Sequence, residues 1–452
     1  MMNTGTRQAA ILCLILSGGL FFAQETNEPK TVTIEEAVSL AMENNIQLSS
    51  SAIDVRMKQR DMNYAWNVFL PSVQATGTLS RRNLSEITAQ TGNPLMPTIT
   101  TKFSEKELWG ASGGLNISLN LNLALFEGLK ATRQGYEAGK IGLQQAQAQT
   151  EKNVRKAFYG ILLQEGSLSL AKDKFTVSEE RLKQTRTNFS NGLVPELAYL
   201  QTQLALETQK PAIMEAELNL EQQKNTFAFL LGLPAGTQIK LNGTIEPKIT
   251  AFDPKELVEK NLANRLDIAL LQKNIEMMGT QIRATTLQRY TPSISLNQSY
   301  QPRLSAIDAD WSNKDNWTDS TGAFSLTLAF NLTNILPISA SGQSLANTKD
   351  ALKKLERTMQ SASYSAELEI RNLVKKLEKS KASLAAMELS VSIAEKAYGL
   401  TEQGYRSGTI EFLDLKDAEN SLLQARLASI SEKFNYTSTM LDLEAALNTK
   451  LN

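Results

Sequence analysis

The side chains that carry most protein chemistry are scarce in this sequence. There is no histidine among the 452 residues, and the single cysteine is Cys13. Histidine-based catalytic triads, histidine general bases and metal sites built from histidine or cysteine are therefore excluded together. We expect a protein that is not an enzyme and that holds neither a metal nor another cofactor.

One pair of acidic side chains remains as a candidate site. Asp414 and Asp417 are three residues apart near the start of the last predicted helix, so they share one helix face. Carboxylates in a first turn are favoured by the helix dipole, and solvated end groups are the simpler interpretation of such a pair.

The N-terminal segment has the pattern of a secretory signal peptide. Arg7 precedes an apolar run from Ala9 to Phe22 that is too short to span a bilayer, and a polar segment follows. We expect residues 1–23 to be removed, which leaves a mature chain without cysteine, as suits an oxidising compartment. An uncleaved anchoring helix is the alternative interpretation.

The charge and hydropathy of the remaining chain limit its partners. The 47 basic and 47 acidic residues balance, so no strong field attracts nucleic acid, and we expect no nucleic-acid partner. No later segment offers 18 uninterrupted apolar residues. If the mature protein spans a membrane, it must therefore do so with strands.

The segment after Gly114 predicts a strand over about 114–126. Large apolar side chains alternate with uncharged polar ones, which places the apolar groups on one face. A half-buried strand in a soluble sandwich alternates in the same way. However, the sixty-odd residues after Gly128 contain no proline until Pro195 and predict one very long helix. Few soluble folds need a strand of membrane-spanning length that leads into such a rod.

The order helix, strand, strand, long helix, turn, helix occurs twice along the chain. The repeats cover residues 33–231 and 254–449, and residues 232–253 connect them. Pro211 predicts a kink or break in the last helix of the first repeat. The first repeat has expected strands at about 72–80 and 114–126 and helices at 130–191 and 196–231; the second has strands at about 293–301 and 323–333 and helices at 344–406 and 411–448.

Four membrane strands cannot close a barrel, because single-chain barrels need at least eight strands and an open edge in lipid leaves backbone groups without partners. The barrel must be shared between subunits, and the bare pattern does not choose between two copies and three. The residues expected to face lipid on the strands are Leu115, Ile117, Leu119, Leu121, Leu123, Phe324, Leu326, Leu328 and Phe330.

Several motifs resemble the TolC-like outer-membrane efflux protein family in their order and spacing. They are A-V-S-L-A-M-E-N-N-I-Q-L, L-P-S before a strand, L-A-L-F-E-G before the long helix, and the turns N-F-S-N-G-L-V-P and G-Y-R-S-G-T-I-E. The resemblance implies a mixed fold, a membrane β-barrel plus a long α-helical barrel, in which a homotrimer completes twelve strands. It also implies a location in the outer membrane, in contact with its lipid, with the helical barrel in the periplasm. The implied function is that of an exit duct docked to a periplasmic adaptor and to an inner-membrane pump or ABC transporter.

The resemblance also assigns roles to individual residues. The turns Gly192-Leu193-Val194 and Gly408-Thr409-Ile410 would contact the adaptor. Asp414 and Asp417 would line the periplasmic entrance, where Tyr405 would belong to the latch of the closed state. A large apolar group exposed at a turn calls for a partner, so Leu193 and Ile410 carry the sharper expectation.

Three departures from the family pattern accompany these roles. Ile410 stands where an arginine is expected, and Ala198 stands where an aspartate is expected, so other contacts must hold a closed entrance, or hold it more loosely. The second strand-to-helix junction, 334–337, lacks the L-F-E-G of the first and is expected to differ in shape. The alternative to a duct is a soluble periplasmic scaffold or adaptor built on long helical hairpins.

Overall fold

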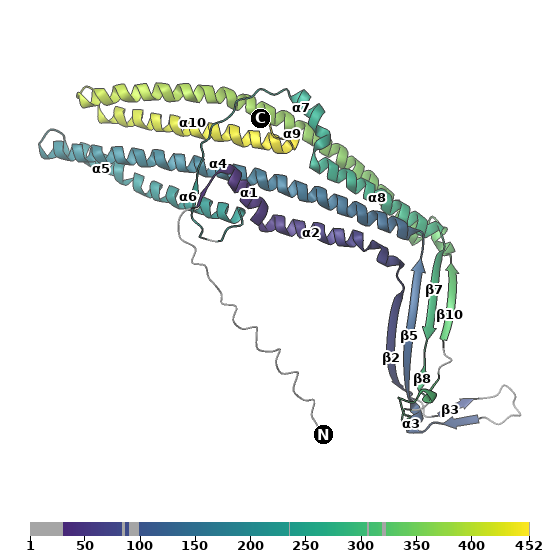
Figure 1. Cartoon of the computed structure of the whole chain (residues 1–452). Helices are drawn as coiled ribbons and strands as arrows, with labels where there is room; N and C mark the ends of the chain where they lie inside the picture. The colour runs from purple at the N-terminus through teal and green to yellow at the C-terminus, as the bar shows by residue number, and fades with distance from the viewer. Residues whose placement is uncertain are drawn as a thin grey trace, which may run out of the picture.

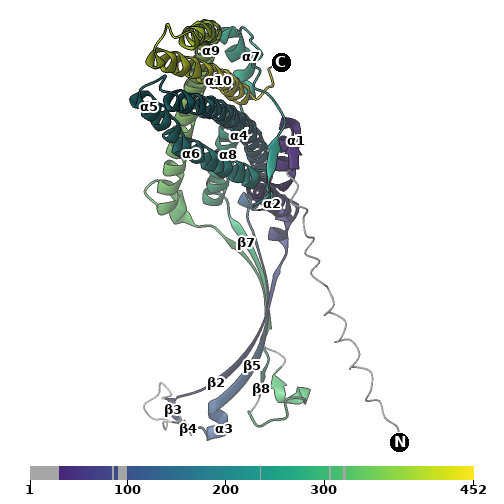
Figure 2. The same cartoon turned by 90° about the vertical axis from the view of Figure 1, so that its left-hand side faces the viewer.

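The computed structural model describes residues 30–83, 86–89, 99–234, 236–304, 307–318 and 322–451. The expected signal peptide, with Cys13, lies outside the described residues. A layer of long helices occupies one end of the molecule, and a slender curled sheet extends from its other end (Figures 1 and 2). The predicted combination of long strands and long helices is therefore confirmed.

Two helices of equal length form the frame of the helical layer. These are α4 (Ala124–Ser190) and α9 (Ala340–Arg406), with 67 residues each, or about 100 Å at 1.5 Å per residue. The chain returns from α4 along α5 (Glu196–Glu207) and α6 (Gln209–Leu230), and from α9 along α10 (Phe412–Leu447). Because α10 contacts both α9 and α4, the order across the layer is α9, α10, α4 and then α5–α6 (Figure 1).

The return path of the first hairpin is interrupted where the sequence contains proline. Thr208 separates α5 from α6, three residues before Pro211. Proline has no N–H to donate to the carbonyl of Glu207, and its ring crowds that carbonyl. The break expected near Pro211 within the segment 196–231 therefore lies at Thr208.

The sheet is built from four long antiparallel strands, two from each repeat. These are β2 (Ser72–Arg81), β5 (Trp109–Leu121), β7 (Ser293–Tyr300) and β10 (Gly322–Ala329), in the order β2, β5, β7, β10. At the far end lie the short strands β3 (Glu86–Ala89), β4 (Ile99–Lys102), β8 (Arg303–Leu304) and β9 (Trp317–Thr318), with α3 (Glu105–Leu108) (Figure 2).

The strand register gives the four long strands two chemically different faces. Leu119 lies opposite Leu296, which lies opposite Leu326, so these large apolar groups share one face, on which Gln298 is the polar exception near the middle. The other face carries only serine, threonine, asparagine, glutamine, glycine and alanine along these strands. Hydroxyl and amide groups bond across it: Ser295 Oγ donates to Asn120 Oδ1 over 2.8 Å.

The limits of two expected strands are corrected by the structure. β5 begins at Trp109 and ends at Leu121, so Leu123 is not a strand residue; it has helical φ and ψ at the start of α4. The early part of β5 shows no apolar alternation, because glycines occupy positions 110, 113 and 114. At the other end of β5, the Leu125 N–H donates to the carbonyl of Asn122, and the chain turns there into α4. Phe330 likewise lies one residue beyond β10.

The two strand-to-helix junctions differ in construction. In the first repeat, the rings of Phe69 and Phe126 pack with centroids 5.6 Å apart. In the second, the chain forms a 3₁₀ turn, η4 (Leu332–Ile335), and the buried Arg289 donates hydrogen bonds to the carbonyls of Asn334 and Ile335 at 2.5 and 2.7 Å. A cation that caps free carbonyls therefore replaces an aromatic contact.

Each repeat also contains a small apolar core halfway along the helical layer. In the first, α1 (Ile34–Asn44) and α2 (Ile46–Asn63) meet α4 and α6, and β1 (Lys30–Val32) pairs in parallel with β6 (Ile239–Leu241). In the second, α7 (Pro254–Asn261) and α8 (Leu266–Tyr290) meet α9 and α10. The most deeply buried large side chains there are Phe158, Ile161, Phe227 and Leu231 in the first core and Ile370, Tyr436, Leu443 and Leu447 in the second.

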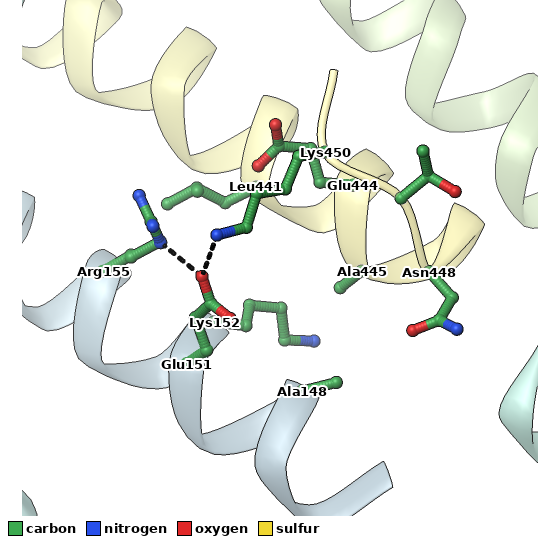
Figure 3. A pocket seen from close by; sticks show the side chains of 10 residues that line it. Ala148, Glu151, Lys152, Arg155, Leu441, Glu444, Ala445, Asn448 and Lys450 are labelled. Carbon is green, nitrogen blue, oxygen red and sulfur yellow. Dashed lines mark hydrogen bonds and ion pairs between the residues drawn. The ribbon is translucent and has the colours of Figure 1, made fainter. Parts of the chain in front are cut away.

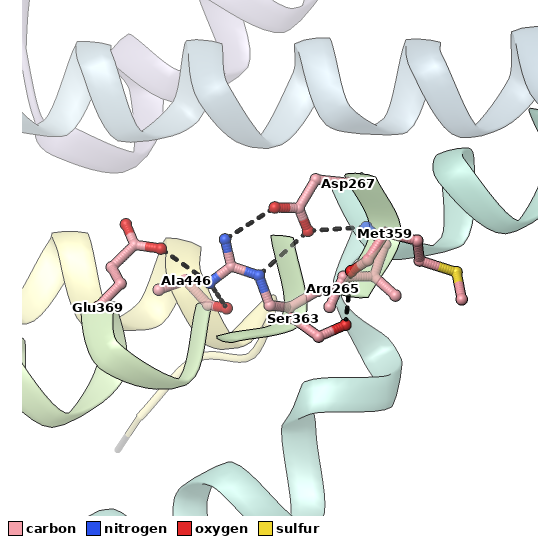
Figure 4. A network of polar contacts seen from close by, with 7 residues as sticks. Arg265, Asp267, Met359, Ser363, Glu369 and Ala446 are labelled. Atoms are coloured by element: carbon pink, nitrogen blue, oxygen red, sulfur yellow. Dashed lines mark hydrogen bonds and ion pairs between the residues drawn. The ribbon is translucent and has the colours of Figure 1, made fainter. Parts of the chain in front are cut away.

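In each repeat, a polar side chain at the start of α2 or α8 binds the last turn of the returning helix, α6 or α10. Arg265, just before α8, donates to both oxygens of Asp267, to Glu369 on α9 and to the carbonyl of Ala446 on α10 (Figure 4). The hydrogen bonds and charge of Arg265 lower the pKa of Asp267. Asn45 makes the equivalent contact in the first repeat: its Nδ2 donates to the carbonyl of Leu230, at the end of α6, over 2.8 Å.

The C-terminal tail is held against α4. Glu151 accepts hydrogen bonds from Arg155 and Lys450 at 3.0 and 3.1 Å, beside a cavity of about 150 Å³ (Figure 3). The Leu451 N–H donates to Glu444 Oε1. The Lys450–Glu151 contact connects the end of the second repeat to the long helix of the first.

The Asn45 contact gives a stability prediction. Asn45 is 8% exposed, and besides its bond to Leu230 it caps α2 by accepting from the N–H groups of Gln47 and Leu48. Asn45→Ala removes this cap and leaves a carbonyl unpaired, so we expect a loss of about 2 kcal/mol in the free energy of unfolding. Denaturant unfolding of the purified protein in detergent measures it. Asn44→Ala, at an exposed neighbour that bonds only within its own helix, should change stability by less than about 0.5 kcal/mol.

Candidate functional site

The two interhelical turns that the sequence singled out lie together at the end of the helical layer farthest from the sheet (Figure 1). Gly192 and Gly408 have φ values of 71° and 77°, a left-handed conformation that glycine adopts without a Cβ clash. The N–H of Leu193 donates to the carbonyl of Asn188, and the N–H of Thr409 to that of Gly404. These bonds are typical of glycine-terminated helices, so the glycines are needed for the turns themselves.

The apolar side chains of the two turns are placed differently. Leu193 is 72% exposed, while Val194 is half-buried. Ile410 is also half-buried, because it folds back over Gly404, where a Cβ would collide with its side chain. The expectation of an exposed apolar group at both turns is therefore wrong for Ile410. Thr409 is exposed, and its hydroxyl donates to the carbonyl of Gly404.

Asp414 and Asp417 lie in the first two turns of α10, and both are exposed. Leu415, which lies between them, is 1% exposed and faces the neighbouring helices, so the two carboxylates point away from the packed side. Neither carboxylate is paired with a cation in the described part of the chain. Within these same residues no group of three or more acidic, histidine or cysteine side chains could hold a metal ion.

Tyr405 lies at the end of α9, half-buried. Its ring contacts that of Phe412, with centroids 6.2 Å apart. This contact joins α9 to α10 within one hairpin. The expected role of Tyr405 in a latch stays a prediction.

A largely shielded ion pair connects the two hairpins close to the tips. Arg181 of α4 and Glu419 of α10 are 2.6 Å apart, and each side chain is 11% exposed. The guanidinium lies 6.0 Å from the centre of the Phe412 ring, and nearby Lys174 donates to Asn420 over 2.7 Å. Burial raises the pKa of the adjacent Tyr398 phenol, with Glu402 and Glu419 adding to the effect.

Sequence reasoning did not find this pair, because Arg181 and Glu419 are 238 positions apart and neither belongs to a motif. Removing one partner of such a shielded pair leaves the other charge without compensation, so loss of either residue should destabilise this contact. With Ile410 and Ala198 in place of the charged residues expected there, Arg181 and Glu419 supply a charged contact between the hairpins.

A cavity of about 120 Å³ lies beside the ion pair, between α4, α5, α6 and α10. The Oε1 atom of Gln209 is buried without a hydrogen-bond partner among the described residues. The cavity has room for a few water molecules only, so it is not a substrate site. Its polar lining includes Ser178, Arg181, Thr202, Gln209 and Glu419.

The strand residues expected to face lipid form an exposed apolar surface in one protomer. Phe324, Leu326 and Leu328 are 65–68% exposed, and Leu115 is 41% exposed. Ile117, Leu119 and Leu121 belong to the same face by register. Among the described helices, none has the length and apolar character needed to cross a bilayer.

Comparison with known proteins agrees with this architecture. "Nodulation protein T" of Rhizobium leguminosarum bv. trifolii is 21% identical over 412 residues, which cover 89% of this chain and 82% of the relative. "Probable efflux pump outer membrane protein TtgC" of Pseudomonas putida is 22% identical over 420 residues, with 92% and 82% covered. The crystal structure of the open state of the Neisseria gonorrhoeae MtrE outer membrane channel superposes with a TM-score of 0.70 at 20% identity, covering 93% of this chain and 89% of that one.

The sequence model of the family described as "Outer membrane efflux protein" matches residues 37–233 and 257–449, which include both repeats almost completely. The chain belongs to the outer membrane efflux protein family.

Proposed function

We propose that three copies of this chain form an exit duct across the outer membrane and the periplasm, as the outer-membrane component of a tripartite efflux pump or a type I secretion system. The observation that carries the proposal is the direction of the two edge strands. β2 and β10 run in opposite directions at the two edges of the sheet. β10 of one copy can therefore continue into β2 of the next as another antiparallel pair.

The chemistry of the sheet supports a membrane location for this shared barrel. In lipid an unpaired edge leaves backbone groups unsatisfied, so a four-stranded sheet must find partners there. Its apolar face would contact lipid, and its uncharged polar face would line the duct. The number of copies follows the TolC-like resemblance, and twelve strands also exceed the minimum of about eight for a closed membrane barrel.

The helical layer would continue the duct into the periplasm and end at the glycine turns. The partners proposed there are a periplasmic adaptor and an inner-membrane pump or ABC transporter. The name of the relative TtgC, an efflux pump outer membrane protein, supports this role. A soluble scaffold, the alternative from sequence, would leave Phe324, Leu326 and Leu328 in water.

A pair of strand variants tests the membrane barrel. Leu119→Arg places a charge on the apolar face, in the row with Leu296 and Leu326 at the middle of the sheet. It should cost about 2–4 kcal/mol in lipid, so trimer recovered from the outer membrane should fall sharply. Asn120→Arg, one residue away on the polar face, should assemble normally. Outer-membrane fractionation and the native mass in mild detergent measure both. A monodisperse parent monomer, or equal damage from both variants, contradicts the proposal.

A variant at the first turn tests adaptor contact. Leu193→Glu charges an exposed apolar group that holds no part of the turn together, so trimers should persist while export and adaptor cross-linking are lost. Gln201→Glu adds the same charge to an exposed position of α5 as the control and should leave export intact. Ile410→Glu, by contrast, should disturb its own turn, because Ile410 packs over Gly404. Unchanged export in Leu193→Glu rejects the contact.

The carboxylates of α10 give a prediction about ion passage. Three copies of Asp414 and Asp417 would focus a negative potential at the entrance. The parent pore in a planar bilayer should be cation-selective and blocked from the periplasmic side by trivalent cations. The double variant Asp414→Ala with Asp417→Ala should lose the block and keep its assembly. Asp350→Ala with Glu356→Ala removes the same charge near the other end of α9 and should remain blocked. Block of the first double variant at the parent's concentration would leave Asp414 and Asp417 as helix-end groups only.

A further inference from the structure

The two outer helices of the helical layer each leave one side without a partner. α10 and α4 lie inside the layer, whereas α9 forms one edge and α5–α6 form the other (Figure 1). Both edge helices pack one side against the layer. Their opposite sides carry rows of exposed apolar groups that nothing in the described chain covers.

The row on α5–α6, which we call the first stripe, follows the helical spacing of three and four. On the packed side of the same helices, Thr202, Leu206 and Phe227 are at most 5% exposed, so the stripe faces away from the layer. Its apolar members are 50–71% exposed: Leu197, Leu200, Leu204, Met214, Leu218 and Phe229.

The row on α9, the second stripe, has the same character. Ile370, Leu373 and Val374 are buried on the side that meets α10, and the stripe lies about half a turn away from them. Its apolar members are 59–70% exposed: Tyr364, Leu368, Leu389, Ile393 and Leu400.

The placement of the stripes at opposite edges defines what can cover them. Apolar rows of this length are unfavourable in water and mark interaction surfaces. One chain cannot bring its own two edges together across α10 and α4. Two different surfaces on one subunit that fit each other produce a head-to-tail contact, which closes into a ring when the rotation allows.

Among the charged residues along the two stripes, two on each lie at matching heights above the tips. On the first stripe, Glu207 and Glu221 lie about 16 and 38 Å from the start of α5 at 1.5 Å per residue. On the second, Lys396 and Lys379 lie about 15 and 40 Å from the end of α9. All four are exposed, and the signs are opposite at each height.

The ion pairs within the chain leave these groups available. Glu207 pairs with Lys210 on its own helix over 2.8 Å, where both side chains are about half exposed. Glu221, Lys379 and Lys396 have no ion-pair partner in the part of the chain that the structure describes.

We propose that the second stripe of one protomer packs antiparallel along the first stripe of a neighbouring copy, with Lys396 beside Glu207 and Lys379 beside Glu221. The proposal rests on the cyclic assembly proposed above and specifies its register in the periplasmic part. The apolar residues supply the contact area, and the two charge pairs fix the sliding of one helix along the other. Slipping by one turn would break the Lys396–Glu207 pair, because the residues one turn from Glu207 are Leu204 and Lys210.

Charge reversal tests the register. Glu221→Lys should place two cations together and shift trimer to monomer in detergent, and Lys379→Glu should do the same. The double variant Glu221→Lys with Lys379→Glu should regain the parent's trimer fraction. If the double variant combines both defects, the two residues are not neighbours and the register is overturned.

Cross-linking tests the same contact by the distance between the two positions, independently of charge repulsion. Because Cys13 is the single cysteine and lies in the expected leader, added cysteines are read without background. Glu221→Cys with Lys379→Cys should give linked dimers and trimers with a short bismaleimide, and either cysteine alone should give none. Gln223→Cys with Lys379→Cys, at a similar height but off the stripe, should stay unlinked.

The two proposals fail in different ways. If the parent protein is a monomer in native mass measurements, the shared duct itself is wrong. If the parent is a trimer but the 221–379 pair does not cross-link, only the stripe register is wrong. A single cysteine that links to itself would indicate a symmetric contact and would overturn the head-to-tail packing.

Discussion

The structure depends on one constraint: neither of its layers can satisfy its own edges. The sheet ends in β2 and β10, whose outer backbone groups have no strand beside them among the described residues. The helical layer ends in two rows of exposed apolar side chains. The unpaired strand edges and the exposed apolar rows both lie at the sides of the molecule, across its long axis. A chain built in this way gains its stability from neighbours, in contrast to a globular domain that surrounds its own core.

The two repeats solve equivalent structural problems with different chemistry. Asn45 and Arg265 both bind a carbonyl in the last turn of a returning helix, one as an amide and the other as a cation held by Asp267 and Glu369. At the strand-to-helix junctions, paired rings in one repeat correspond to Arg289 capping free carbonyls in the other. The two repeats therefore have stabilising contacts at equivalent positions, but different residues make them.

Much of the fold could be predicted from periodic features of the sequence. Alternation located β2, β7 and β10 to within a few residues, and the long intervals without proline indicated α4 and α9. The start of β5 was missed because its glycines carry no apolar signal. Leu123 and Leu125 continued the alternation of β5 although the backbone there already belongs to the start of α4. The Arg181–Glu419 pair and the inward fold of Ile410 depend on tertiary placement, which no local pattern reports.

The polar face of the sheet has a further consequence if it lines a passage. Its hydroxyl and amide groups can both give and accept hydrogen bonds, and along the four long strands no fixed charge stands among them. A molecule with hydrogen-bonding groups that moves past such a wall exchanges one hydrogen bond for another of similar strength. The wall therefore presents a nearly level free-energy surface, on which solutes of very different structure would diffuse at similar speed and none would be retained.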